Sequence, residues 1–320
     1  MPKKGCLGCS FPVIVGLLVG FLALFIVGFI VGPIGRSMLG DLGLPSWLSI
    51  PRPDPRLPAE VVFHLFGFPI TNSVIAAWLT IIVLVGISYA VTRKVKLIPS
   101  RLQAFLESIL GWLYGFCQEV AGEENGRRFF PVVTTIFLFV IVNAWLGLLP
   151  GFGSIYITGP EGEHVHLLRP ANTDINVPLA IALMSFVFVE YFGIRSLGGF
   201  RYLSKFVNVG AFGGGLKQVF SGKLKAGMGE MFSGAINIFV GMLEALSELI
   251  RIVSFTFRLF GNMTAGEILL LIVMFLVPFV VALPFYGLEL LVGFVQALIF
   301  GGLTLVFLTL AVAHHGAEAH

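Results

Sequence analysis

Long apolar runs separated by short polar stretches organise this chain. Each of the first four runs is long enough for a helix that crosses the roughly 30 Å hydrocarbon core of a bilayer. These runs occupy residues 11–31, 74–91, 129–149 and 175–194. Two larger apolar blocks follow at 231–283 and 285–313, broken by Pro278 and Pro284. The pattern predicts an all-α integral membrane protein with several transmembrane helices.

The block 231–283 is too long for one upright crossing. At about 1.5 Å per residue its helix would far exceed the hydrocarbon thickness. It must therefore be steeply tilted, bent or divided, and Gly261 and Gly266 are possible bends.

Two intervening stretches have other patterns. Residues 101–120 place Glu107 and Gln118 among apolar residues at helical spacing, which is typical of an amphipathic helix at the membrane surface. Residues 34–72 are rich in proline and suit an extended loop. We therefore divide the chain into an N-terminal anchor with an external proline-rich loop, 1–73, and a membrane core, 74–320.

The distribution of charge predicts the topology. Only 12% of residues are charged, against about 25% in soluble domains. Cations cluster at 3–4, 93–101, 127–128 and 195–225, whereas the loops 34–72 and 150–173 are poorer in them. The positive-inside rule then places the N-terminus in the cytoplasm. The cations lie in short loops rather than in one large patch, so nucleic-acid binding is not indicated.

The N-terminal segment leaves two questions open. Residues 11–31 are long for a signal peptide, which favours a retained anchor over cleavage within 1–33. Cys6 and Cys9 form a CxxC pair beside basic residues. We interpret them as cysteines near the membrane surface; acylation is an alternative, and a metal or redox role is less favoured.

Familiar catalytic motifs are missing from the sequence. It contains no H-E-x-x-H pair, no complete phosphate-binding loop and no Ser-His-Asp order. We therefore predict no cofactor, no metal and no catalysis by this chain alone. The remaining chemistry is the movement of a cation.

One polar stripe runs along the apolar block 231–283. On a helix its members lie within about 40° of the Arg258 direction, and Glu267 points to the opposite side. The stripe comprises Glu244, Ser247, Arg251, Ser254, Arg258 and Asn262. Arginine stays protonated, and placing it at the bilayer centre costs about 2.5–3.5 kcal/mol on insertion scales. Arg258 therefore meets either a polar partner outside this helix or a carboxylate inside the bundle.

Acids inside the apolar blocks are candidates for a proton relay. Glu267 and Glu289 can each become neutral in the membrane, which arginine cannot do. Gln296 lies seven residues after Glu289, on the same helix face, and could bond to Arg258 or to water. Glu248 lies about 80° off the stripe, so either a water-filled vestibule or an interfacial charge explains it.

The string Arg258-Leu-Phe-Gly-Asn262-Met-Thr-Ala-Gly-Glu267 closely resembles subunit a (subunit 6) of bacterial F-type ATP synthases. Further segments fit that family in the same order, and the likeness runs from about residue 68 to 313. They begin at Pro99, Asn143, Pro170 and Gln296.

The resemblance implies an ion-translocating stator with two long, strongly tilted C-terminal helices beside a c-ring. Arg258 would face the c-ring carboxylate and prevent direct proton passage between two half-channels. The outer path, or the surroundings of the arginine, would use Glu267, Glu289, Gln296, Asn262, Asp174 and Asn176. The cytoplasmic path would use Glu244, Ser247, Glu248 and Arg251. The implied partners are protons, the c-ring, b-type peripheral stalk subunits and lipid, in the bacterial inner membrane.

The chain also departs from the family pattern. Gly147 stands where many relatives have an aspartate, Phe307 stands where tyrosine is frequent, and the first span is extra. A secondary ion transporter is the alternative function, although no internal repeat supports it. A scaffold for assembly is a third hypothesis.

Overall fold

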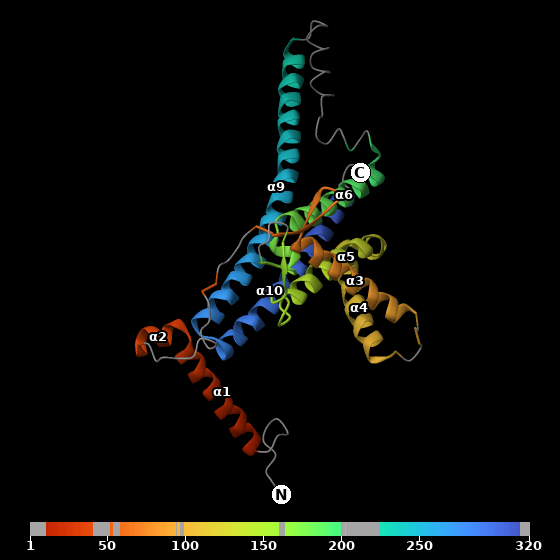
Figure 1. Ribbon diagram of the computed structural model, residues 1–320. Coiled ribbons are helices and arrows are strands. Elements are labelled where there is room, and N and C mark those ends of the chain that lie inside the picture. The colour runs from red at the N-terminus through yellow and green to blue at the C-terminus, as the bar shows by residue number, and fades with distance from the viewer. Residues whose placement is uncertain are drawn as a thin grey trace. The chain divides into compact units, whose positions relative to one another are not determined.

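The computed structural model describes residues 11–40, 52–53, 58–93, 95–96, 99–159, 164–199, 202 and 224–313. Cys6, Cys9 and most of the predicted basic loop 195–225 lie outside these residues. The elements in chain order are α1 (Phe11–Val31), α2 (Pro33–Leu39), β1 (Val61–Leu65), β2 (Phe68–Thr71), α3 (Asn72–Thr92), α4 (Arg101–Ala121), α5 (Glu123–Gly147), β3 (Tyr156–Thr158), β4 (His164–His166), η2 (Ala171–Thr173), α6 (Asn176–Leu197), α9 (Leu224–Leu276), η3 (Phe279–Val281) and α10 (Ala282–Ala313) (Figure 1).

The predicted membrane helices are confirmed. Among the described residues, six stretches are long and apolar enough to cross a membrane, and they lie in α1, α3, α5, α6, α9 and α10. Helix α4 is not one of them, in agreement with its amphipathic pattern. Its first turn is capped by Ser100, whose side chain accepts the backbone N–H of Gln103 at 3.4 Å.

Helix α9 is a single helix of 53 residues. At about 1.5 Å per residue it is about 80 Å long, against roughly 30 Å of hydrocarbon. Of the three solutions expected for the long apolar block, division does not occur between Leu224 and Leu276, because α9 passes through Gly261 and Gly266 as one helix (Figure 1). The break comes at Pro278, after which η3 leads into α10. Pro284 lies in the first turn of α10, where its missing N–H is tolerated.

The prediction of an extended loop over 34–72 is wrong for part of that stretch. Helix α2 occupies its start, and β1 pairs antiparallel with β2 near its end. The turn between these strands contains Phe66 and Gly67, both at positive φ, 50° and 85°. Two consecutive residues at positive φ are typical of the tight hairpin turns that match strand twist. A second hairpin, β3 with β4, lies between α5 and α6.

The chain divides into two compact units. The first unit comprises 1–76, 144–174 and 261–295, and the second comprises 77–143, 175–260 and 296–320. Helices α9 and α10 each contribute residues to both.

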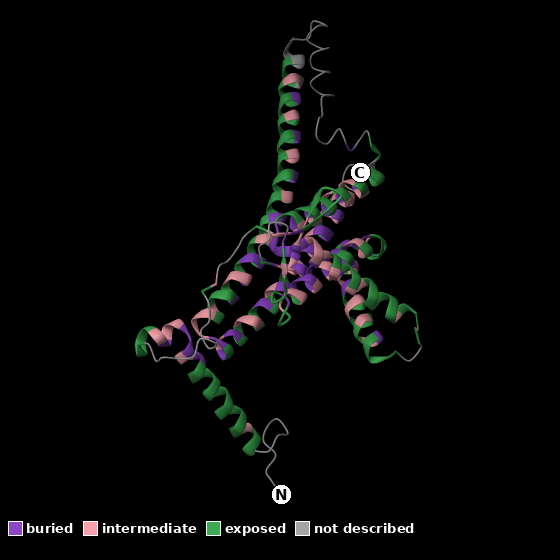
Figure 2. Ribbon diagram, in the orientation of Figure 1, coloured by how far each residue is buried: buried purple, intermediate pink, exposed green. Residues whose placement is uncertain are grey.

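Each unit has its own packing. In the second unit α4, α5, α6 and α10 share a buried core that includes Cys117, Phe129, Val189 and Leu305. In the first unit α1 is exposed along most of its length and becomes buried only at its end (Figure 2). There the backbones of Gly28 and Gly32 lie against the carbonyls of Pro278 and Leu276. The long exposed apolar surface of α1 suits a helix surrounded by lipid.

Candidate functional site

The predicted site residues fall into both units. The first unit contains Asp174, Asn262, Glu267 and Glu289. The second contains Asn176, Glu244, Ser247, Glu248, Arg251, Arg258 and Gln296. Most residues assigned to the outer path therefore belong to one compact unit, and all those assigned to the cytoplasmic path belong to the other. We describe each group separately.

Glu267 forms an ion pair in the first unit. Nη2 of Arg169 donates to Oε2 of Glu267 at 3.2 Å, and the two side chains are 10% and 29% exposed. The other nitrogens of the arginine are also bonded: Nε to the Thr173 hydroxyl and Nη1 to the Pro58 carbonyl, both at 3.1 Å. This network fixes the position of the Arg169 guanidinium. It therefore also fixes the side from which the arginine contacts Glu267.

Glu289 belongs to the same unit and approaches α9 next to Glu267 in the sequence. It is buried at 7% exposure, and its carboxylate rests against the backbone of Gly266, the residue before Glu267. A Cβ atom at Gly266 would overlap both carboxylate oxygens. The glycine is therefore what lets an acid on α10 approach α9 so closely. The Glu289 carboxylate thus contacts α9 one residue before Glu267.

Asp174 has a different surrounding. It is buried at 7% exposure and accepts a hydrogen bond from the Ser73 hydroxyl at 2.5 Å. Gly147, at the end of α5, packs directly on the Pro170 ring, which a Cβ atom would overlap. A larger side chain at this position would therefore require the Pro170 ring to move.

Arg258 is exposed in the second unit. Its Nη2 donates to the Ser254 hydroxyl at 3.4 Å, and its guanidinium carbon lies 5.9 Å from the centre of the Phe255 ring. None of the acids in the described part of the chain forms an ion pair with it. The alternative of an arginine neutralised by a carboxylate inside the bundle therefore finds no support among the described residues.

An uncovered apolar face flanks Arg258 on α9. Its side chains recur at helical spacing and are at least half exposed. They are Leu246, Leu249, Ile250, Val253 and Phe257. An arginine at the edge of such a face is placed to meet a second apolar surface that carries an acid.

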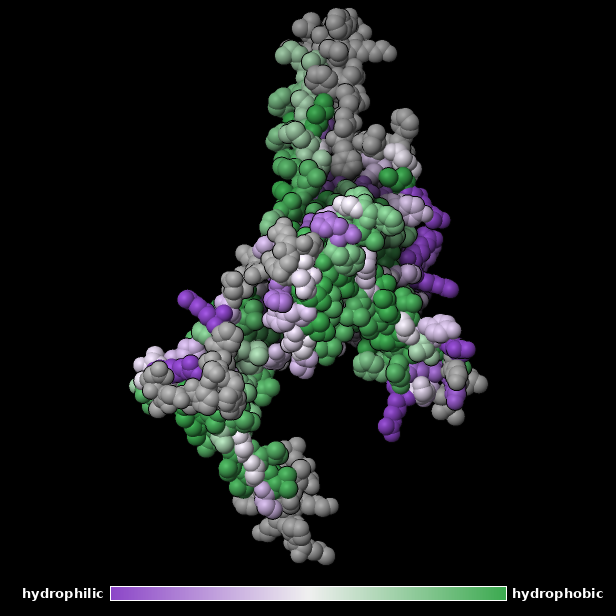
Figure 3. All heavy atoms as spheres, in the orientation of Figure 1, coloured by the Kyte–Doolittle hydropathy of each residue, from purple (hydrophilic) through white to green (hydrophobic). Residues whose placement is uncertain are grey.

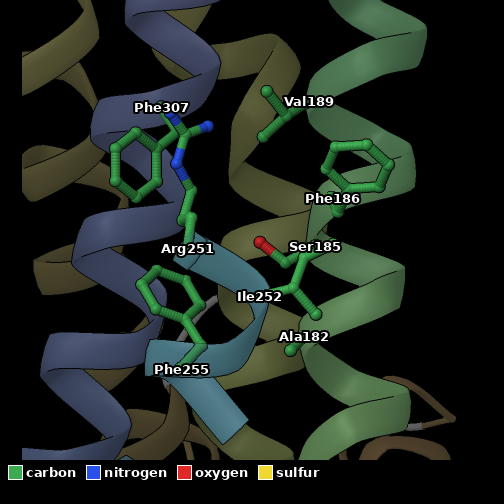
Figure 4. A pocket seen from close by; sticks show the side chains of 8 residues that line it. All are labelled: Ala182, Ser185, Phe186, Val189, Arg251, Ile252, Phe255 and Phe307. Atoms are coloured by element: carbon green, nitrogen blue, oxygen red, sulfur yellow. The ribbon is translucent and has the colours of Figure 1, made fainter. Parts of the chain in front are cut away.

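Arg251 is held by an aromatic ring. Its guanidinium carbon lies 3.6 Å from the centre of the Phe307 ring, within range of a cation–π interaction (Figure 4). A cavity of about 10 Å³ adjoins both residues and Ser185, whose hydroxyl is hydrogen-bonded to that of Thr304 at 2.8 Å. Such a cavity is at the lower limit for one water molecule. Phe307 thus supplies the ring on which Arg251 stacks.

Several acids surround Tyr202 in the second unit. Burial, a hydrogen bond with Glu190, and the negative charges of Glu190, Glu248 and Glu244 raise the pKa of Tyr202. Its ring packs on Gly193 of α6, and Glu248 is 6% exposed. Glu248 is therefore a buried member of an acidic group and not a solvated interfacial charge.

The remaining predicted residues divide by exposure. Ser247, Asn262 and Asn176 are exposed, whereas Gln296 is buried at 8% exposure. Within the predicted stripe of α9, Ser247, Ser254, Arg258 and Asn262 are exposed, whereas Glu244 and Arg251 are only partly exposed.

Sequence reasoning missed Arg169, Glu190 and Tyr202. Glu190 is an acid inside an apolar run, the same signal that selected Glu267 and Glu289. Arg169 and Tyr202 lie between spans, where a charged or polar residue carries no such signal. Their neighbours are distant in sequence, and only the fold brings them together.

Comparison with known proteins identifies the family. Residues 74–309 match the family model described as ATP synthase A chain. The chain belongs to this family. ATP synthase subunit a of Gloeobacter violaceus is 34% identical over 76% of this chain and 85% of its own length. The corresponding protein of Geobacter sp. (strain M21) is 31% identical over 79% of this chain and 93% of its own length. That of Moorella thermoacetica is 29% identical over 81% of this chain and 98% of its own length.

Membership of the ATP synthase A chain family assigns the function at the level of the complex. The chain is a multi-pass membrane protein and a proton-translocating stator subunit in the membrane sector of an F-type ATP synthase. It works as part of that complex and is not a catalyst by itself. The predicted family and the predicted all-α membrane fold are both confirmed.

Proposed function

We propose that this chain provides two proton half-channels that are kept apart by Arg258. Glu267 and Glu289, with Asp174, Asn176, Asn262 and Gln296, serve the outer path or the surroundings of the arginine. The cytoplasmic path uses Glu244, Ser247, Glu248 and Arg251. The observation that carries the proposal is the exposed Arg258, which no acid of the described chain neutralises, on the edge of an uncovered apolar face.

The electrostatics of Arg258 explain why it must have no permanent partner. A fixed positive charge in a medium of low dielectric constant stabilises the anionic form of a carboxylate that comes near it. A passing c-ring carboxylate then gives up its proton to the cytoplasmic path and takes a new one from the outer path. Each proton that crosses 100 mV releases about 2.3 kcal/mol, so several must cross for each ATP.

The uncovered face of α9 beside Arg258 is the proposed contact with the c-ring. We also propose b-type peripheral stalk subunits as partners, the bacterial inner membrane as the location, and a cytoplasmic N-terminus. In this scheme residues 1–73 form an anchor and residues 74–320 the conducting core. Purification of the chain in mild detergent should recover the ring and stalk subunits, and their absence would contradict the assembly.

Replacement of Arg258 tests the mechanism. Arg258→Ala in the assembled complex should abolish ATP-driven proton pumping into membrane vesicles, measured by the quenching of a pH-sensitive dye. Arg195→Ala is the matched control, because Arg195 also donates to a neutral hydroxyl four residues earlier, that of Tyr191 at 3.1 Å. Recovery of the c-ring with both variants shows that assembly is intact. Pumping at the normal rate in Arg258→Ala would refute the role of this residue.

A further inference from the structure

A hollow with two arginines lies at the end of α1. It has a volume of about 360 Å³ and is lined by Val31, Pro33, Arg36, Arg52 and Phe275. All five residues belong to the first unit. Hydrophilic side chains gather around α2, next to the apolar surface of α1 (Figure 3). Neither arginine belongs to the proton path described above.

The ends of two candidate spans place this hollow at the membrane boundary. The span in α1 ends at Val31, and the span in α9 ends at Leu276. These ends are packed together, since the backbone of Gly32 lies against the Leu276 carbonyl. The polar headgroups of a bilayer begin where its hydrocarbon core ends. The arginines are therefore at headgroup depth.

Among the residues that the structure describes, no negative charge balances the two arginines of the hollow. No acid in the described part of the chain forms an ion pair with Arg36 or Arg52. Nε of Arg36 is buried and has no hydrogen-bond partner. Buried donors are nearly always bonded, so this nitrogen calls for an acceptor that the described residues do not supply.

The lining matches one class of ligand. Guanidinium groups bind phosphate oxygens through paired, charge-assisted hydrogen bonds. Val31, Pro33 and Phe275 offer an apolar wall next to the charges. A molecule that satisfies both parts has a phosphate joined to a hydrocarbon chain.

We propose that Arg36 and Arg52 bind the phosphate of a membrane phospholipid, with the first part of an acyl chain against Val31 and Phe275. This site goes beyond proton translocation and stands independently of the role of Arg258. It gives the N-terminal helices, which precede the residues matched to the family, a function of their own: holding one lipid between α1 and the end of α9. Free inorganic phosphate shares the headgroup chemistry but lacks the chain.

Lipid binding to the purified complex tests this proposal. The complex is stripped of exchangeable lipid in detergent and titrated with phosphatidylglycerol, and bound molecules are counted by native mass spectrometry. We expect Arg36→Gln/Arg52→Gln to lose one tightly held lipid for each complex, and its affinity for that lipid to fall by at least about tenfold. The matched control is Arg93→Gln, an exposed arginine at the end of another candidate span, stacked on Tyr89. It should retain the lipid.

Two further ligands distinguish the sources of phosphate. A diacylglycerol, which has the chains but no phosphate, should not occupy the site, and inorganic phosphate at millimolar concentration should not displace the lipid. Arg36→Lys keeps the charge without the paired geometry and should show an intermediate loss of lipid binding. This variant still tests the site if the double variant fails to fold. Unchanged lipid retention in the double variant, equal loss in Arg93→Gln, or full displacement by inorganic phosphate would overturn the proposal.

Discussion

Arg169 and Arg258 show how different surroundings give one residue type two roles. Arg169 is nearly buried, and its three kinds of nitrogen are all bonded, one of them to Glu267. Arg258 is exposed and donates to a single neutral hydroxyl. The first can only position an acid, because its geometry is fixed. The second keeps its charge available for an acid that arrives from elsewhere.

We predict that Arg169→Gln weakens both stability and proton pumping. A hydrogen bond to a charged group contributes about 1.5–3 kcal/mol, and partial exposure of Glu267 lowers this through solvation, so we expect a loss of about 1–2 kcal/mol. The measurements are the thermal unfolding midpoint of the complex and its pumping rate. The double variant Arg169→Gln/Glu267→Gln should recover part of the stability, because no unpaired carboxylate remains.

The control for Arg169 is another ion pair of this chain. Nη2 of Arg128 lies 2.7 Å from Oε1 of Glu124, but the two side chains are 61% and 79% exposed. Such a pair contributes about 0–1 kcal/mol, so Arg128→Gln should leave both measurements nearly unchanged. If the two variants behave alike, Arg169 has no special relation to Glu267.

Gly266 is predicted to determine where the carboxylate of Glu289 lies. In Gly266→Ala the new methyl group would overlap that carboxylate, which must then move away from α9. We expect slower pumping with little loss of the assembled complex, because a side chain can yield where a backbone cannot. Gly287→Ala, on the same helix as Glu289 and facing open space, is the matched control. Equal pumping by both variants would show that the approach to Glu289 is not needed.

At the scale of elements, the sequence predicted those features that depend on local pattern. Apolar length identified the membrane helices, and amphipathic spacing identified α4. The hairpin of β1 and β2 was missed, because prolines such as Pro58 and Pro69 suggested a loop, while the turn at Phe66 and Gly67 depends on backbone angles. The pair of Arg169 and Glu267, which are 98 residues apart, follows only from packing.

The docking of α1 gives a prediction about a whole element. A methyl group at Gly32 would overlap the backbone carbonyl of Leu276, which cannot rotate aside. We therefore expect Gly32→Ala to destabilise the first unit by about 1–3 kcal/mol, as overpacking does. Gly20→Ala lies in open space within α1, before its docked end, and should be neutral or slightly stabilising. Thermal unfolding in detergent compares the two. Equal midpoints would mean that the end of α1 is not tightly docked.

At the scale of the whole molecule, the candidate spans bear on topology. The described residues contain six of them, an even number, so both termini lie on the same side of the membrane if each span crosses once. The described cations after α3, around the start of α5 and at the end of α6 are Arg93, Lys96, Arg101, Arg127, Arg128 and Arg195. The positive-inside rule predicts that these cations lie in the cytoplasm, and the termini lie on the same side as they do if each span crosses once.

Reporter fusions check this topology. Green fluorescent protein at the C-terminus should fluoresce, because it folds in the cytoplasm, and alkaline phosphatase joined after Gly153 should be active, because it matures only outside. Fusions after Lys96 should give the reverse pattern for the phosphatase. The overlong α9 makes the C-terminal fusion decisive: if this helix of 53 residues did not cross the membrane, α10 alone would carry the C-terminus to the outside. An inactive C-terminal fluorescent reporter with an active phosphatase there would therefore contradict a single crossing by α9 or by α10, even if every earlier loop behaved as predicted.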